Sequence, residues 1–146
     1  GLTMRSVNRT ALVPFSPAQM YALVEDVERY PEFLPWCAGA TLHERDERSL
    51  RASIRIGLAG LSSRFGTRNE LDPPHRMTMD LVEGPFESLH GEWRFLPVGE
   101  NGCEARLSME FAFSSKAQDA VFGVAFEKIC TDLIDAFIKR AQALYG

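Results

Sequence analysis

Apolar and polar positions alternate with a period of two through most of this chain. Such runs lie at 5–13, 37–47, 50–58, 64–71, 77–81, 89–95 and 103–113. This period is typical of strands in a sheet that buries one face. Short turns rich in Gly, Pro and Asp separate the runs, so we expect successive strands to be antiparallel neighbours. The pattern predicts a sheet of about seven strands.

Two further segments follow a helical period. Residues 17–30 place apolar side chains three and four apart, directly after a Ser-Pro dipeptide that is typical of a helix start. The second helix begins with a capping box, Ser115 and Gln118, and its apolar stripe continues to the end of the chain. About 30 residues of helix would be about 45 Å long. Between the first helix and the second strand, the Pro-bounded segment 31–37 predicts at most one more helical turn.

The apolar faces of these elements predict the architecture. The sheet has one apolar face and the long helix has one wide apolar stripe, so the two are expected to pack together. We therefore expect an α+β fold in which a curved antiparallel sheet wraps around a long C-terminal helix, with one or two short helices after the first strand. A twisted sheet cannot touch a straight helix everywhere, which predicts a cavity between them. We assign residues 4–146 to one domain and expect residues 1–3 to be a cloning remnant.

Composition narrows the class of protein. The chain has 146 residues, ten of them Phe, with 45% hydrophobic and 25% charged residues, which excludes disorder and small disulfide scaffolds. The net charge of −4 gives no overall attraction to nucleic acid, and no DNA partner is expected. The cysteines, Cys37, Cys103 and Cys130, are interpreted as reduced, mostly buried thiols. Without an apolar run of membrane-spanning length, we expect a cytoplasmic protein that lies at most at the periphery of the inner membrane.

Four longer motifs then point to a known superfamily. They are TALVPFSPAQMYALVEDVERYPEFLPWC at 10–37, FGTRNEL at 65–71, LVEGPFESLHGEWRFLP at 81–97 and AFEKI at 125–129. Together they resemble the START-like (helix-grip, SRPBCC) superfamily. Within it they resemble the bacterial oligoketide cyclase/lipid transport family, which includes the coenzyme Q-binding protein and the ribosome-association toxin.

That resemblance implies a hydrophobic tunnel between the sheet and the C-terminal helix. It implies binding and transport of a polyprenyl quinone such as ubiquinone, or of another lipid, in support of respiratory electron transport, and this is our leading hypothesis. The alternative is a toxin that binds the large (50S) ribosomal subunit and blocks subunit joining. A weaker alternative is a polyketide cyclase/dehydrase. The motifs do not distinguish these branches, and neither the ligand nor the oligomeric state follows from them.

Several apolar side chains occur where turns are usually polar, which marks ligand entrances or partner contacts. We interpret Phe33, Leu34, Trp36 and Phe86, which we place in loops, as a lid over the cavity entrance. The alternative is that they only cap the core. The expected wall residues of the cavity are Phe65, Thr67, Asn69, Met79, Trp93, Phe122 and Phe126. Thr67 and Asn69 are the polar candidates, which either hydrogen-bond a ligand carbonyl or satisfy local backbone or water.

No catalytic motif accompanies these pocket residues. His43, His75 and His90 are isolated and share no pattern with a Cys or Ser. A cyclase needs a general acid–base pair aimed into its cavity, and the inward positions supply none. We therefore expect a protein that is not an enzyme, with no catalytic residues, no metal site and no required cofactor, whose bound molecule is ubiquinone or a lipid.

A cluster of arginines is the remaining candidate site. Arg51, Arg55, Arg64 and Arg68 share the outward parity of two consecutive strands, so they should be close neighbours. Such a patch could contact ribosomal RNA or an anionic membrane surface. The alternative is a solvent-exposed face joined by salt bridges, because carboxylates share the same parity. These are Glu70, Asp80, Glu92, Glu104 and Glu110.

Overall fold

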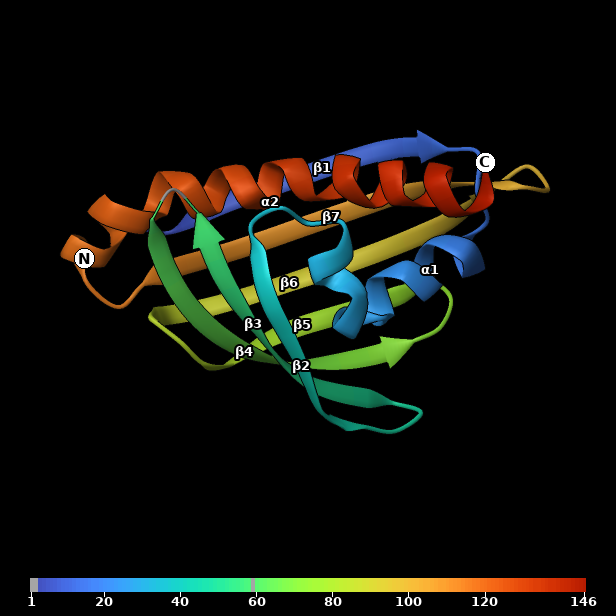
Figure 1. Ribbon diagram of the computed structural model, residues 1–146. Helices are drawn as coiled ribbons and strands as arrows, with labels where there is room; N and C mark the ends of the chain where they lie inside the picture. The colour runs from blue at the N-terminus through green and yellow to red at the C-terminus, as the bar shows by residue number, and fades with distance from the viewer. Residues whose placement is uncertain (1–2, 59) are drawn as a thin grey trace.

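The protein forms one antiparallel sheet with its helices on the concave side (Figure 1), in a computed structural model that describes residues 3–58 and 60–146. Gly1 and Leu2 of the expected remnant lie outside these residues. The elements are β1 (Arg5–Val13), α1 (Pro17–Glu25), the 3₁₀ helix η1 (Val27–Glu32), β2 (Cys37–Arg45), β3 (Ser49–Leu58), β4 (Leu61–Asp72), β5 (Arg76–Glu83), β6 (Phe86–Val98), β7 (Gly102–Phe113) and α2 (Lys116–Tyr145). Within the described ranges, no helix has the length and hydrophobicity that crossing a membrane requires.

The strand order is β1-β7-β6-β5-β4-β3-β2, with every neighbouring pair antiparallel. The strands β2 to β7 are therefore a meander, as their short connecting turns predicted. The first strand is the exception, because it pairs with the last along its whole length, from Arg5 opposite Phe111 to Val13 opposite Cys103. The predicted fold class, with seven strands and a long C-terminal helix, is confirmed.

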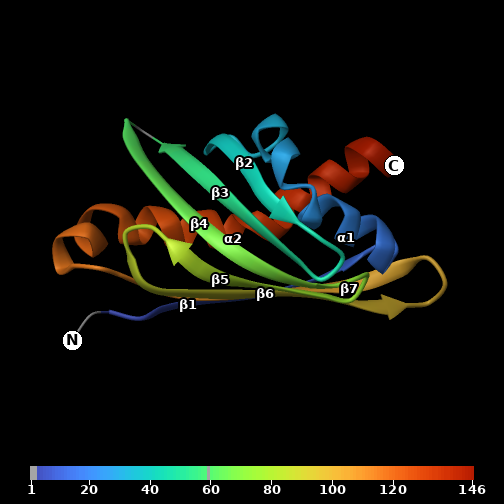
Figure 2. The ribbon, with the colours of Figure 1, turned by 90° about the horizontal axis from the view of Figure 1, so that it is seen from below.

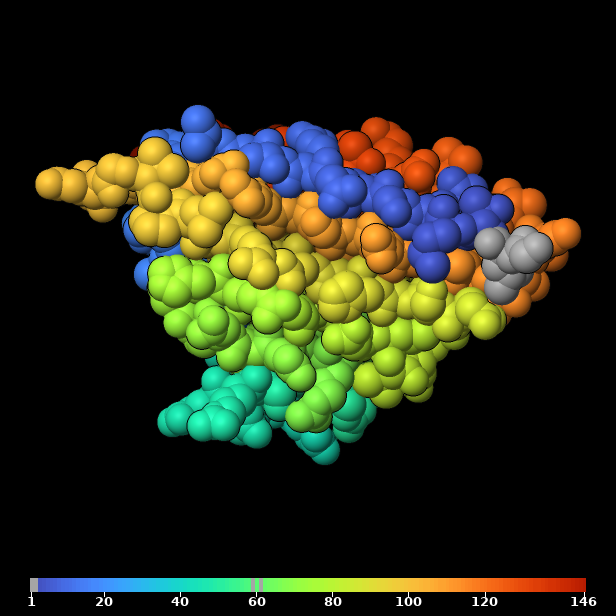
Figure 3. Space-filling model, turned by 180° about the vertical axis from the view of Figure 1, so that it is seen from behind, coloured from blue at the N-terminus to red at the C-terminus, as the bar shows by residue number. Residues whose placement is uncertain are grey.

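The sheet curves around α2. Seen from below, β1, β5, β6 and β7 lie beneath the helix, while β2, β3 and β4 bend upward beside it (Figure 2). The opposite face of the sheet carries no helix in the described residues and presents β1, β7, β6 and the green strands in turn (Figure 3). Apolar side chains of α2 on its sheet side, from Phe126 to Ala141, are buried, so this helix supplies one wall of the core.

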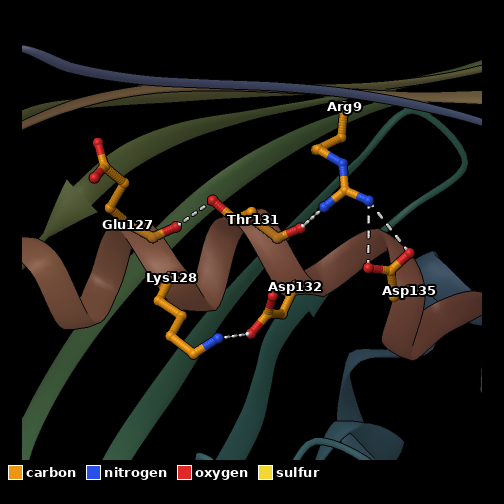
Figure 4. A network of polar contacts seen from close by, with 6 residues as sticks. All are labelled: Arg9, Glu127, Lys128, Thr131, Asp132 and Asp135. Carbon is orange, nitrogen blue, oxygen red and sulfur yellow. Dashed lines mark hydrogen bonds and ion pairs between the residues drawn. The ribbon is translucent and has the colours of Figure 1, made fainter.

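Ion pairs fasten α2 to the edge strand β1. Arg5 makes a two-point contact with Asp119, with N–O distances of 2.9 and 3.1 Å. One turn further along, Gly123 leaves room for this guanidinium, because a Cβ atom there would lie 2.5 Å from Nη2 of Arg5. Arg9 donates to the Thr131 carbonyl oxygen at 2.5 Å and contacts both Asp135 oxygens at 3.3 Å (Figure 4). Directional contacts at these points fix the height of the helix above the sheet.

The first helix is shorter than its sequence pattern predicted. The α-helix ends at Glu25, and the residues from Val27 to Glu32 form a 3₁₀ helix instead. In a continued α-helix the ring of Pro31 would clash with the preceding turn and leave a carbonyl without a donor. The Tyr30 hydroxyl donates to the carbonyl of Val24, one of those left free at the end of α1. The segment thus turns sharply and brings Tyr30 under the helix α2.

The prediction that Phe86 lies in a loop is wrong. Phe86 is the first residue of β6, pairs with Phe113 of β7 and is only 6% exposed. The turn signal from Gly84 and Pro85 is genuine, since Gly84 has a φ of 141°, but the turn is shorter than expected. A Cβ at Gly84 would lie 2.7 Å from Cβ of Phe65, so only glycine permits this tight return of the chain.

We expect the Arg5–Asp119 contact to stabilise the fold, so Asp119→Asn should lower the midpoint of thermal unfolding at pH 7 by a few degrees. The hydrogen bond from Arg5 is the main cause that lowers the pKa of Asp119 below its usual 3.8. A lowered pKa in the folded state means stability that is complete above the unfolded value of about 3.9 and is lost as pH falls through the folded value. The variant should therefore lose less stability than the wild type on acidification below about pH 4. The matched control is Asp132→Asn on the same helix, whose ion pair with Lys128 is exposed. Equal effects of the two substitutions would contradict this role of Arg5.

Candidate functional site: a cavity under the long helix and an arginine surface behind it

An apolar cavity lies between the inner face of the sheet and α2. It has a volume of about 70 Å³, counted as the space open to the centres of water molecules. The lining residues come from η1, the strands β3 to β7 and α2. They are Val27, Tyr30, Trp36, Ala52, Ile54, Phe65, Thr67, Asn69, Met79, Leu89, Trp93, Met109, Phe126, Ile129, Cys130, Leu133 and Phe137. Both tryptophans of the chain are among them.

Two aromatic clusters close the ends of this cavity. At one end, Phe126 of α2 packs against Phe65, Phe86 and Phe111, with ring centroids 4.8 to 5.8 Å apart. At the other end, Phe137 packs against Tyr30 and Trp93 with centroids 5.4 Å away. Phe126 and Phe137 are three turns of helix apart, about 16 Å. The cavity is the gap that remains between these two points of close contact.

A second, smaller cavity lies beyond the first aromatic cluster, towards the start of α2. It has about 30 Å³ and is lined by the β3–β4 hairpin, the ends of β6 and β7, and α2. Phe126 and Ile129 line both cavities, so these two side chains form the partition between them. Displacing them would join the two spaces into one tunnel that runs along the helix.

The predicted wall residues divide between these spaces. Phe65, Thr67, Asn69, Met79, Trp93 and Phe126 line the larger cavity. Phe122 lines only the smaller one, where Phe126 lies too. The predicted wall included Phe122 and Phe126 of α2 but missed other residues of the first helical region and of α2, including Tyr30, Cys130 and Phe137. Cys130 and Phe137 belong to the apolar stripe of α2, and only the curvature of the sheet decides which residues of that stripe border empty space.

The predicted lid residues do not act together. Trp36 lines the larger cavity and Phe86 the smaller one, on opposite sides of the partition. Leu34 is only 1% exposed and is a core residue. Phe33 borders a separate surface cleft between α1 and the end of α2, where the Arg140 guanidinium stacks 5.0 Å above its ring. The four side chains are therefore too dispersed to form one lid. Of the four, Trp36 lines the larger cavity and is half-buried.

The polar pair in the cavity wall is satisfied within itself. The Thr67 hydroxyl donates to Oδ1 of Asn69 at 2.7 Å, and Nδ2 of Asn69 points to the Met77 sulfur at 3.6 Å. Both residues are buried, at 8% and 3% exposure. This favours the local alternative for these residues, yet among the described residues Nδ2 has no partner beyond that weak sulfur contact and keeps a hydrogen to donate. The amide is the polar group that an apolar molecule with a carbonyl would meet.

The size of the cavity limits what it holds as it stands. A volume of 70 Å³ holds only a few water molecules, each of which takes up about 30 Å³ in the liquid. Pockets that hold drug-sized ligands usually measure about 300–1,000 Å³. A small ring fits between the aromatic clusters, whereas a prenylated quinone requires the partition and part of the wall to move.

The four arginines lie on the opposite face of the same two strands. Arg51 of β3 is the direct cross-strand partner of Arg68 of β4, and Arg55 is the partner of Arg64. Their expected proximity is thus confirmed. The salt-bridge alternative holds for only half of them among the described residues. Arg51 lies 3.7 Å from Glu44 and Arg64 lies 3.3 Å from Glu83.

The sequence and the fold both match known proteins. The family described as polyketide cyclase / dehydrase and lipid transport matches residues 13–138. The chain belongs to this family. Its START-like architecture is shared by solved structures, which include a START superfamily protein from Mycobacterium smegmatis (TM-score 0.78, 20% identity, 95% and 98% of the two chains). The Zhui aromatase/cyclase from Streptomyces sp. R1128 has a TM-score of 0.83 at 17% identity over 96% of this chain and 94% of that one.

Two relatives of this family member are informative by name. It is 45% identical over 143 residues to the "Ribosome association toxin RatA" of Vibrio cholerae, with 98% of this chain and 99% of that protein covered. It is 27% identical to the mitochondrial "Coenzyme Q-binding protein COQ10" of Drosophila melanogaster, covering 97% of this chain and 60% of that protein. Of the three branches that the sequence motifs left open, the quinone-binding branch and the ribosome-associated branch are therefore represented by name among these relatives.

The ionisable groups on the cavity wall of this family member are held neutral. Burial raises the pKa of the Cys130 thiol to about 12, and the nearby Glu127 adds to the shift. Burial likewise raises the pKa of the Tyr30 hydroxyl, which donates to a backbone carbonyl. A thiol is a nucleophile only as the thiolate, so Cys130 acts here as an apolar wall residue. The histidines His43, His75 and His90 are exposed and lie outside the cavity lining. The predicted burial of all three cysteines is confirmed.

The Thr67–Asn69 hydrogen bond predicts strong coupling between the two residues. Thr67→Val should destabilise the protein by about 1–3 kcal/mol, because it leaves a buried amide oxygen without a donor. The double variant Thr67→Val/Asn69→Leu should cost clearly less than the sum of the two single changes. Urea unfolding of the four proteins measures this cycle. Additive costs would mean that the two side chains do not form the bond.

Proposed function

We propose that this protein associates with the ribosome as a toxin of the RatA type. The observation that carries the proposal is the 45% identity to the Vibrio cholerae protein across 98% of this chain and 99% of that one. Similarity of this extent includes every element of the fold, from β1 into α2, and leaves no domain of the relative unmatched. The Escherichia coli protein of the same name supports it at 38% identity over 145 residues. The expected target is the large subunit, and the expected consequence is fewer joined ribosomes in the cytoplasm.

Sedimentation tests this proposal directly. The purified chain is mixed with separated small and large ribosomal subunits at low salt and centrifuged through sucrose. We expect it to migrate with the large subunit, and induced expression in cells should lower the proportion of joined ribosomes and slow growth. Protein that stays at the top of the gradient with both subunits, at concentrations well above that of the subunits, would refute the proposal.

A second candidate function, binding of a hydrophobic ligand, is favoured by a different observation. The larger cavity is lined almost wholly by apolar side chains and has one amide at its wall, which suits a flat ring with a carbonyl. The relative named for coenzyme Q binding supports the same class of ligand, although at 27% identity.

Binding of such a ligand can be measured by the intrinsic tryptophan fluorescence of the protein, since Trp36 and Trp93 both border the cavity. A benzoquinone with a short isoprenoid chain should quench their fluorescence on binding. Gly91→Ala should weaken binding at least tenfold, because its Cβ would lie 2.5 Å from Sδ of Met109 and 2.7 Å from Cε of Met79 and would push both side chains into the cavity.

The matched control for this change is Gly57→Ala, where the added Cβ makes only an ordinary contact of 3.4 Å with Ala38. Its quinone affinity should equal that of the wild type. Absence of quenching in the wild type would refute ligand binding. Equal affinities of the Gly91→Ala and wild-type proteins would show that the quinone binds elsewhere.

Catalysis is not part of the proposal. A cyclase needs an acid and a base that exchange protons near neutral pH, and burial moves the pKa of both Tyr30 and Cys130 away from that range. The similarity to the Streptomyces cyclase, at 17% identity, concerns the fold. The expectation that the chain is not an enzyme and needs no cofactor or metal stays a prediction.

A further inference from the structure

We propose that Arg51, Arg55, Arg64 and Arg68, here called the arginine quartet, bind the phosphates of a double-helical RNA segment. The inference rests on the proposed association with the ribosome and names the surface that makes the contact. The inference starts from the cross-strand pairing of these arginines, which by itself lowers the stability of the sheet. Like charges on directly opposite positions of neighbouring strands destabilise a sheet, and β3 and β4 place two arginine pairs in this way.

Another row of arginines on the same face is compensated, which means that carboxylates of the protein contact its guanidinium groups. Arg76, Arg94 and Arg106 follow one another as cross-strand partners on β5, β6 and β7. Here each guanidinium has a carboxylate. Arg76 lies 2.7 Å from Glu92, Arg94 contacts the same carboxylate, and Arg106 lies 3.3 Å from Glu104. This row has its counter-charges within the protein and leaves little positive charge for a partner.

The quartet differs from this row in its counter-charges. Arg55 and Arg68 have no carboxylate within the 4 Å of an ion pair in the part of the chain that the structure describes. Asp80 is the register partner of Arg68, but its carboxylate contacts His90 at 2.6 Å instead. The carboxylates that pair with Arg51 and Arg64 are exposed, at 69% and 50%, so water and salt weaken both contacts.

Three of the four guanidinium groups are nevertheless held in place by neutral acceptors. Arg64 donates to Oγ of Ser53 at 3.2 Å, and Arg68 donates to Oγ of Ser49 at 3.3 Å. Arg55 lies over Gly39 and reaches the carbonyl of Ala38 at 3.4 Å. Each contact uses one of the five N–H donors of an arginine and cancels no charge. The remaining donors are free for a phosphate, which arginine binds through two parallel hydrogen bonds.

The shape of the surface favours a double-helical RNA over a single strand or a membrane. Between the two arginine pairs lie Ser53 and its cross-strand partner Gly66, and the Ser53 hydroxyl contacts the His43 ring at 2.7 Å, so the centre is polar. The aromatic residue of β3 and β4 is Phe65, which lines the cavity, so among the described side chains these strands offer no outward ring to stack on an unpaired base or to anchor in lipid. Double-stranded RNA is recognised through its phosphates and its shape, and this recognition needs no exposed aromatic ring. The pairs lie about 13 Å apart along the strands, so they can contact more than one phosphate.

The test compares Arg55→Gln/Arg68→Gln with Arg94→Gln/Arg106→Gln, which removes the same charge from the compensated row. Binding to large ribosomal subunits and to a short RNA duplex is measured at several salt concentrations. The first variant should bind at least tenfold more weakly than the wild type, and its logarithmic salt slope should be shallower by about two. The second should retain the wild-type affinity and slope. The unfolding midpoint of the first variant should not fall, because its change relieves repulsion.

The outcomes separate this inference from the proposed function. Wild-type protein that binds the subunit while the Arg55→Gln/Arg68→Gln variant binds equally well would overturn the quartet and leave ribosome association standing. Quartet-dependent binding to the duplex without binding to the subunit would overturn ribosome association and keep the RNA surface. Quartet-dependent binding to vesicles of anionic phospholipid, with none to the duplex, would overturn the inference in favour of a membrane.

Discussion

The packing of α2 into the concave face of the sheet determines nearly everything else in this protein. A straight helix and a twisted sheet touch closely only in places, and here those places are Phe126 and Phe137 with their aromatic neighbours. Between the two contacts the surfaces diverge and a cavity remains. The ion pairs from Arg5 and Arg9 fix the helix along β1, so the width of the gap is set by the protein and not by a ligand. The aromatic residues are therefore mainly core, and the cavity is a consequence of where that core ends.

The strands β3 and β4 carry both candidate sites, one on each face. On β3, Ala52 and Ile54 line the cavity, and the alternate positions Arg51 and Arg55 belong to the quartet. On β4 the same alternation places Phe65, Thr67 and Asn69 inside. A one-residue slip of either strand would place arginines in the core, so the burial of the cavity wall also fixes the quartet. Ligand binding and RNA contact are chemically independent, yet they depend on the same register.

Sequence periodicity predicted this alternation well, because the side chains of a strand strictly alternate between faces. It thus predicted the strands, the opposed arginines and most of the inner wall. It failed where the outcome depends on tertiary packing. The end of α1 depends on Tyr30 taking the free Val24 carbonyl, and Phe86 joins β6 because Phe111 and Phe126 enclose it. Periodicity cannot predict the cavity volume either, since the cavity is the small space that remains where the surfaces of the sheet and α2 do not meet. The Thr67–Asn69 bond likewise depends on rotamers that no pattern encodes.

The small cavity and the exposed arginines have different implications for function. An apolar gap of 70 Å³ is a loss of packing that the rest of the core tolerates, and a ligand must enlarge it before it gains contacts. The arginines are already exposed on the outer face, and neutral acceptors hold Arg55, Arg64 and Arg68 in place there. A partner that supplies phosphates would remove a repulsion that the free protein carries, so association is favoured even before any new contact is optimised. Of the two faces of β3 and β4, the outer one is therefore prepared for its partner, while the inner one must first open.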